Sequence, residues 1–169
     1  MAGSHPRCGF VKVDSFFKRP SNFMFVTSKG CFSDTLSPNF TLRELTRTST
    51  GLSNEPHDYT VVANLRQVAE QILEPVRKHF NQPVIIHSGY RSPAVNKAVK
   101  GSARSDHCHG RAVDFHVKGF TNYDVVCWMA DNIKYHQLIL ENFLPNSPTS
   151  GWVHCAIFKG MDPKVQTKF

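Results

Sequence analysis

The sequence of 169 residues lacks the features that define several protein classes. No apolar run approaches the roughly 18 to 20 residues that a membrane-spanning helix needs. Residues 1–7 lack the charged, apolar and small-residue pattern of a signal peptide, so we expect a protein made in the cytoplasm. The cysteines number five and contain no Cys-x-x-Cys pair, which argues against a disulfide framework and a thiolate zinc knuckle. We expect reduced thiols, although Cys8 and Cys31 could form a bridge.

Acidic residues are in the minority, and the net charge of +7 favours an anionic partner such as nucleic acid, a membrane surface or the acidic polymer of a bacterial cell wall. The basic residues are scattered, and no helix-turn-helix, zinc-finger or ribonucleoprotein signature is present, so no nucleic-acid partner is expected. A hydrophobic content of 40% at this length fits one compact domain. We expect that domain to be a monomer.

Local patterns predict helices and strands from about residue 41 onward. Apolar residues at helical spacing and capping residues predict helices over residues 41–46, 59–80 and 121–133, and a further helix that begins at Ser92 and Pro93. Pro75 should bend the second helix or break it near Glu74. Strands are predicted over residues 83–90, 111–117, 135–141 and 151–157. Residues 1–38 are the least readable and are predicted to form a short hairpin or an irregular flap.

Residues 105–114 contain the most informative motif. They offer an imidazole at His107, a glycine turn at Gly110 and a carboxylate at Asp114, and a second imidazole follows at His154. Two neutral nitrogens and one carboxylate are the ligands of a catalytic zinc ion, because three protein ligands leave one tetrahedral position for water. Strand alternation would place Asp114 on the sheet face opposite to the core-facing Val113, Phe115 and Val117, where a buried carboxylate needs a partner.

Other residues compete for these roles, because a chain with nine histidines contains chance pairings. His109 and His116 are the closest competitors for the metal, and His116 could instead support a ligand. Arg91 stands between a buried strand and the metal motif, where its guanidinium could meet a carboxylate or a developing oxyanion. An ordinary solvated or locally paired arginine is the alternative. The remaining histidines are interpreted as surface or core residues: His5, His57, His79, His87 and His136.

Seven stretches of the chain form a recognisable series: Phe40-Thr-Leu-Arg-Glu44, Asn64-Leu65, Leu73-Glu-Pro-Val-Arg77, Ser88-Gly-Tyr-Arg-Ser-Pro93 with Asn96, Ser105-x-His-x-x-Gly-x-Ala-x-Asp114, Gln137-Leu-Ile-x-Glu141 and Trp152-Val-His154. With these motifs in the same order, residues 39–158 resemble the M15 zinc peptidases, in the D-Ala-D-Ala carboxypeptidase-type branch that includes phage endolysins. The resemblance implies an α+β fold, with a central antiparallel sheet and packed helices, shared in outline with the hedgehog signalling domain. The domain would span residues 39–169 and follow an extension over residues 1–38.

The resemblance also implies roles for individual residues. His107, Asp114 and His154 match the ligands of one Zn²⁺ ion, and Arg91 matches an arginine that binds a substrate carboxylate or polarises the scissile carbonyl. Ser105 and Trp152, which closely precede two of the ligands, are expected to contact substrate.

The chain departs from the family pattern at the catalytic base. Several branches carry an acid or a histidine three residues before the last ligand, where this chain has Gly151. We therefore predict that Glu141 is the base, with Asp106 and His109 as fallbacks. A surface glutamate that simply ends a strand is the other interpretation of Glu141.

The expected activity is hydrolysis of peptide bonds in bacterial peptidoglycan, by an L-Ala-D-Glu endopeptidase or a D-Ala-D-Ala carboxypeptidase. The expected partners are the peptide stems of the wall. A phage lysis protein that reaches the wall after holin release would fit the expected lack of a signal peptide. A zinc-stabilised module that binds the wall without turnover is the alternative.

Overall fold

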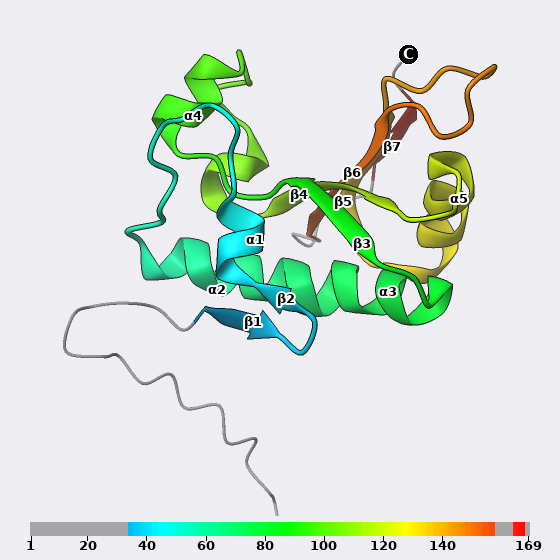
Figure 1. Cartoon of the computed structure of the whole chain (residues 1–169), viewed down its shortest axis with the longest axis horizontal. Coiled ribbons are helices and arrows are strands. Elements are labelled where there is room, and N and C mark those ends of the chain that lie inside the picture. The colour runs from blue at the N-terminus through cyan, green and yellow to red at the C-terminus, as the bar shows by residue number, and fades with distance from the viewer. Residues whose placement is uncertain (1–33, 158–163, 168–169) are drawn as a thin grey trace, which may run out of the picture.

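The computed structural model describes residues 34–157 and 164–167 (Figure 1). Its main sheet has five strands in the order β3-β4-β6-β5-β7, and a separate short sheet pairs β1 with β2. Paired strands run antiparallel except β5 and β7, which are parallel. The strand bounds are β1 Thr35–Ser37, β2 Phe40–Thr41, β3 Val84–Ser88, β4 Ala112–Val117, β5 Tyr135–Glu141, β6 Trp152–Ile157 and β7 Lys164–Thr167.

These strands and the helices beside them confirm the predicted α+β fold with a central antiparallel sheet. Strand β7, which the sequence patterns did not indicate, adds a parallel partner to β5. The prediction of a hairpin or flap over residues 1–38 falls mostly outside the described residues. Only the end of that segment is described, where β1 pairs with β2.

The helices begin at the predicted capping residues. In three of them a side-chain hydroxyl accepts a hydrogen bond from a backbone N–H in the first turn: Thr41 from Glu44, Ser92 from Val95 and Thr121 from Asp124. Their bounds are α1 Leu42–Thr46, α4 Pro93–Ala98 and α5 Asn122–Asn132. The predicted start positions are therefore confirmed by the hydrogen bonds that cap them.

The predicted long helix over residues 59–80 is continuous but not uniform. Helix α2 (Tyr59–Val68) passes through a π-helical turn, η1 (Ala69–Leu73), into α3 (Glu74–Phe80). The N–H of Glu74 donates to the carbonyl of Ala69, five residues earlier, and Pro75 lies in the first turn of α3. The chain thus accommodates Pro75 by widening one turn instead of ending the helix at Glu74.

The two faces of the main sheet have different surroundings. Val113 and Phe115 of β4 and Leu138 of β5 are fully buried in one apolar cluster with residues of α2, η1, α3 and α5. Large side chains of this kind each stabilise the fold by about 1.5–3 kcal/mol. The segment α2–η1–α3 runs along this side of the sheet (Figure 1). Strand alternation therefore directs Asp114 to the opposite face, as predicted.

A row of residues in register crosses the opposite face. Ser88 of β3 pairs with Asp114 of β4, Asp114 pairs with His154 of β6, and His154 pairs with Ile139 of β5. This register brings side chains together that are far apart in the sequence.

Within the described residues, none of the helices combines the length and the apolarity needed to cross a membrane.

Candidate metal centre and active site

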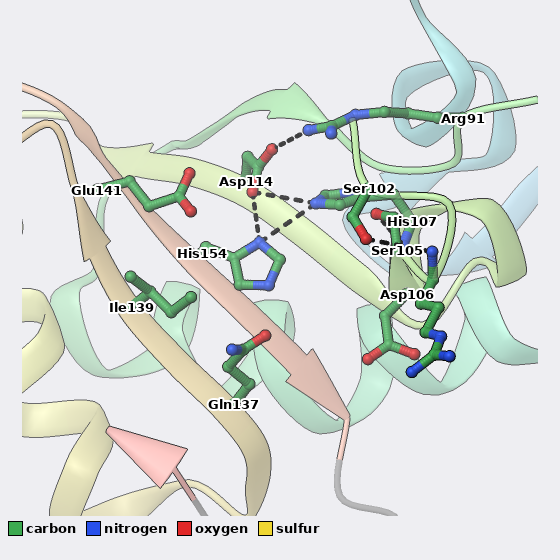
Figure 2. A pocket seen from close by; sticks show the side chains of 11 residues that line it. Arg91, Ser102, Ser105, Asp106, His107, Asp114, Gln137, Ile139, Glu141 and His154 are labelled. Carbon is green, nitrogen blue, oxygen red and sulfur yellow. Dashed lines mark hydrogen bonds and ion pairs between the residues drawn. The ribbon is translucent and has the colours of Figure 1, made fainter. Parts of the chain in front are cut away.

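Three polar side chains meet on this face of the sheet, and each comes from a different local structure (Figure 2). Asp114 and His154 are cross-strand partners on β4 and β6. His107 lies on a short 3-10 turn, η2 (Asp106–His109), which Gly110 ends with a φ of 66°. A Cβ at Gly110 would lie 2.7 Å from the carbonyl oxygen of Val61, so a side chain here would disturb the turn. The turn and the glycine together bring His107 beside Asp114.

Two of the three distances within this cluster are close to those around a tetrahedral metal ion, and the third is at hydrogen-bond length. Asp114 Oδ1 lies 2.7 Å from His154 Nδ1 and 3.2 Å from His107 Nε2, and the two nitrogens are 3.2 Å apart. Zinc bonds of about 2.0–2.2 Å place neighbouring ligand atoms roughly 3.3 Å apart. The three residues are only 3–8% exposed, and no residue with an ammonium or thiol group belongs to the set. Their donor chemistry is that of a zinc site with an open position.

A second layer of contacts orients these side chains. His107 Nδ1 lies 2.6 Å from the carbonyl oxygen of Gly89. Because a carbonyl only accepts, Nδ1 carries the proton and Nε2 presents its lone pair to the cluster. Asp114 uses its second oxygen, Oδ2, to form an ion pair with Arg91. Metal-binding histidines commonly donate to a backbone carbonyl, as His107 does to Gly89, and this bond fixes the orientation of the imidazole ring before any ion binds.

The surroundings of Asp114 keep it ionised. Burial alone would raise the pKa of Asp114, but the close contacts of its carboxylate with the imidazoles of His107 and His154 outweigh that effect and hold its pKa well below the usual range. A buried carboxylate therefore carries its negative charge at neutral pH. The cluster has an anionic ligand ready for a divalent cation.

Arg91 is held on the same face and points into the cluster. Its Nε donates to Ser88 Oγ at 2.7 Å, and its guanidinium also pairs with Asp114. The Arg91 backbone N–H donates to the carbonyl of His107 at 3.1 Å. The structure thus places the predicted substrate-binding arginine against a predicted metal ligand, where it both pairs with Asp114 and lines the cavity.

A buried asparagine, which no sequence pattern singles out, holds the Arg91 segment. Asn54 is 6% exposed, and its Nδ2 donates to the carbonyls of Thr46 and Tyr90, at 2.8 Å each. Its Oδ1 accepts from the N–H of Ser92 at 2.6 Å. Asparagine in a polar turn usually bonds to its own backbone neighbours. No local pattern distinguishes Asn54 from such residues, because its partners lie up to 38 positions away.

Glu141 lies beside the cluster at the end of β5. It is the cross-strand partner of Trp152, and Ile139, two residues earlier, is the partner of His154. In Figure 2 the Glu141 carboxylate points from β5 toward Asp114 and His154. The indole N–H of Trp152 donates to Glu141 Oε2 at 3.0 Å. Trp152 was predicted to contact substrate, and in the structure its polar group is directed at Glu141.

Gly151, at the position where other branches carry an acid or a histidine, has no room for a side chain. Its φ is 69°, and a Cβ there would lie 1.9 Å from the carbonyl oxygen of Glu141. Any larger residue would force the β5–β6 connection to move. The absence of a base at this position thus has a structural reason, and it leaves Glu141 as the acid closest in register to His154.

The cluster opens into a cavity of about 370 Å³, which is large enough for a short peptide segment. Ser105, predicted to contact substrate, lines this cavity. Ser102, Arg104 and Gln137, to which the sequence patterns assign no role, also line it. The lining residues are Arg91, Ser102, Arg104, Ser105, Asp106, His107, Asp114, Gln137, Ile139, Glu141 and His154.

The competing residues occupy other positions. Asp106 lines the cavity, but its Oδ1 pairs with the guanidinium of Arg111 at 3.0 Å. His109 is exposed and does not line the cavity. His116 Nδ1 faces His87 Nε2 at 2.7 Å. Within residues 34–157 and 164–167, the metal-capable group consists of His107, Asp114 and His154.

Comparison with known proteins gives one family match that covers the whole site. The family model described as Peptidase M15 matches residues 38–156. No curated protein matches the chain. The matched segment contains every residue of the cavity lining.

Proposed function

Because the chain belongs to the peptidase M15 family, we propose that it is a zinc-dependent hydrolase of the peptide stems of bacterial peptidoglycan. The observation that carries this proposal is the buried group of His107, Asp114 and His154 at the base of an open cavity. The family supports a metallopeptidase that acts on peptide bonds. The net charge of +7 supports an acidic polymer as its substrate.

His107 Nε2, Asp114 Oδ1 and His154 Nδ1 would hold the ion, because these three atoms face one another. A bound zinc ion supplies Lewis-acid polarisation of the substrate carbonyl and lowers the pKa of a water molecule. Gly89 keeps the lone pair of His107 directed at the cluster, and Asp114 provides the negative charge that a divalent cation needs. The protein's own residues thus determine where the reaction takes place.

Glu141 is the proposed general base. Its carboxylate lies next to the cluster, receives a hydrogen bond from Trp152 that fixes its orientation, and lines the cavity. It would take a proton from the attacking water and return that proton to the leaving amine. Arg91 would stabilise negative charge that develops on the carbonyl oxygen, since its guanidinium lies beside Asp114 and faces the same cavity.

Replacing Glu141 with glutamine tests this role. The glutamine side chain would keep an oxygen that can accept from Trp152, so we expect the Glu141→Gln protein to retain its zinc ion and lose turnover by about 10²- to 10⁴-fold. The exposed Glu70 lies outside the cavity lining, and Glu70→Gln is the matched control, with unchanged turnover. Normal turnover by the Glu141→Gln protein would rule out Glu141 as the base and direct attention to Asp106.

The bond that is cut can be read from the products. Purified peptidoglycan is treated with the full chain, with chelator, and with chelator followed by zinc, and the soluble fragments are measured by mass spectrometry. An L-Ala-D-Glu endopeptidase would create a new amino terminus on D-glutamate, whereas a D-Ala-D-Ala carboxypeptidase would release D-alanine. We expect one of these products, lost with chelator and restored by zinc. Binding to the wall without any product would instead support a zinc-stabilised binding module.

The same proposal gives the protein a biological setting. We infer a phage lysis protein that is made in the cytoplasm and reaches the wall after a holin has opened the membrane. Lysis of outer-membrane-stripped cells by added protein, sensitive to chelator, would support this setting. A protein that cuts purified muropeptides but leaves intact walls undamaged would contradict it.

A further inference from the structure

The charged side chains that line the cavity differ in whether they have an ion-pair partner. Asp114 pairs with Arg91, and Asp106 pairs with Arg111, which lies outside the lining. Arg104 also lines the cavity, and its backbone N–H donates to Ser102 Oγ at 3.2 Å. Among the residues that the structure describes, the Arg104 guanidinium has neither an acidic partner nor a hydrogen bond.

Arg91 is poorly placed to bind a second carboxylate. Its Nε donates to Ser88, and one terminal nitrogen is paired with Asp114. Two-point binding of a carboxylate needs two parallel N–H groups on one edge of the guanidinium. The edge that Arg91 would use is therefore partly occupied, whereas both edges of Arg104 are available to a ligand in the cavity.

The position of Arg104 relative to the cluster is set by its loop. The carbonyl of Ser102 accepts from Asn96 Nδ2 at 2.9 Å and from the N–H of Ser105 at 3.0 Å. Ser105 Oγ in turn accepts from the N–H of His107 at 3.3 Å. The loop is thus tied to α4 on one side and to the η2 turn of His107 on the other. Arg104, which is exposed and lines the cavity, therefore lies on the His107 side of that cavity.

We propose that Arg104 binds a carboxylate of the substrate and makes this protein select peptides with a negative charge close to the scissile bond. The inference deepens the proposed peptidase function and rests on it for the reaction. A guanidinium without an acidic partner has no ion pair to break before it binds a carboxylate, and it is more weakly hydrated than an ammonium group. Peptidoglycan stems can offer this group at the α-carboxylate of D-glutamate or at the C-terminus.

Four synthetic pentapeptides separate these two sources. The probe is L-Ala-γ-D-Glu-L-Lys-D-Ala-D-Ala, which contains both candidate bonds, with the D-glutamate carboxylate and the C-terminal carboxylate each left free or converted to the amide. We expect zinc-loaded wild-type protein to prefer one free carboxylate by about 10- to 100-fold in kcat/KM. In Arg104→Ala this preference should disappear through a higher KM, while kcat/KM for the amidated peptide stays unchanged.

Two further variants control for charge and geometry. Arg104→Lys should recover part of the preference, because it keeps the charge and loses the planar fork. Lys97→Ala removes an exposed positive charge on α4 outside the cavity and should keep the full preference. Equal losses for free and amidated peptides in Arg104→Ala, or an unchanged preference, would overturn the proposal.

A binding measurement keeps this test separate from the reaction. Calorimetric titration of zinc-loaded Glu141→Gln protein, with and without Arg104→Ala, gives the ratio of Kd values for the free and amidated peptides. If wild-type protein cleaves the peptides but the ratio of Kd values is the same with and without Arg104, the role of Arg104 is refuted and the peptidase function stands. If the ratio of Kd values depends on Arg104 but neither the peptides nor peptidoglycan are cleaved, the peptidase function is refuted and the role of Arg104 in binding stands.

Discussion

Replacement of Asn54 by alanine should destabilise the protein and displace Arg91. Asn54 makes three hydrogen bonds to backbone groups from a side chain that is 6% exposed. They connect the end of α1, through Thr46, to the segment of Tyr90 and Ser92 on either side of Arg91. Alanine at this position would leave the N–H of Ser92 and two carbonyl groups without these partners.

The size of the effect follows from these bonds. Each contributes about 1 kcal/mol net, so the loss in unfolding free energy should be about 3 kcal/mol. For a chain of this length, that loss corresponds to a fall in Tm of about 6–12 °C. Turnover should fall as well, because the backbone on both sides of Arg91 loses its anchor.

Thermal unfolding of the zinc-loaded full chain measures this loss, and peptide hydrolysis is followed in parallel. Asn132→Ala is the matched control. Its side-chain Nδ2 donates to one backbone carbonyl, that of Trp128, at 2.8 Å on the exposed side of α5. That bond should be worth less than about 1 kcal/mol. If Asn54→Ala melts within about 2 °C of wild type, or no lower than Asn132→Ala, the reasoning about the buried network is refuted.

Two further predictions concern a glycine and a carboxylate away from the metal ligands. Gly151→Ala should lower the free energy of unfolding by more than about 2 kcal/mol, because its Cβ would meet the carbonyl oxygen of Glu141 at 1.9 Å. Gly119→Ala, at a φ of 81° with open space around it, should lower it by about 1 kcal/mol. Equal melting temperatures of the two variants would contradict this prediction. Burial would raise the pKa of Glu74, but hydrogen bonds from Asn39 and Ser37 outweigh that effect and hold its pKa below 4.5. The ionised Glu74 carboxylate therefore stabilises the fold above pH 4.5, and this contribution is lost as the pH falls through the lowered pKa. Denaturant titrations should therefore show Glu74→Gln less stable by about 1 kcal/mol at pH 7, with a difference that shrinks in acid, and a pH-independent difference would count against this carboxylate.

Much of the fold could be predicted because its signals are local. Helix starts at Thr41, Ser92 and Thr121 depend on a hydroxyl and an N–H three residues later. Strand alternation decides that Asp114 and Val113 face opposite sides. Patterns of this kind are visible within a few residues. The α+β architecture was implied by the family resemblance, which the residues and order of the motifs carry.

The features that were missed depend on contacts between distant residues. The pairing of Arg91 with Asp114 joins positions 23 apart, and the bond from Ser92 to Asn54 joins positions 38 apart. Strand β7 is recognisable only from its pairing with β5. The effect of Pro75 was predicted as a bend or a break, but the π-helical turn before it depends on how the whole helix packs against the sheet. Tertiary packing decides each of these outcomes, and the local sequence does not contain it.

The roles of the cluster residues stay predictions until an ion is measured there. The most direct test is the zinc content of the purified full chain after equilibration with zinc and removal of excess metal, determined by mass spectrometry for wild type, His154→Ala and the exposed control His57→Ala. We predict one tightly held ion per chain in wild type and in the control, and almost none in His154→Ala. The same zinc content and affinity in His154→Ala as in wild type would contradict the assignment of His107, Asp114 and His154 as the metal centre.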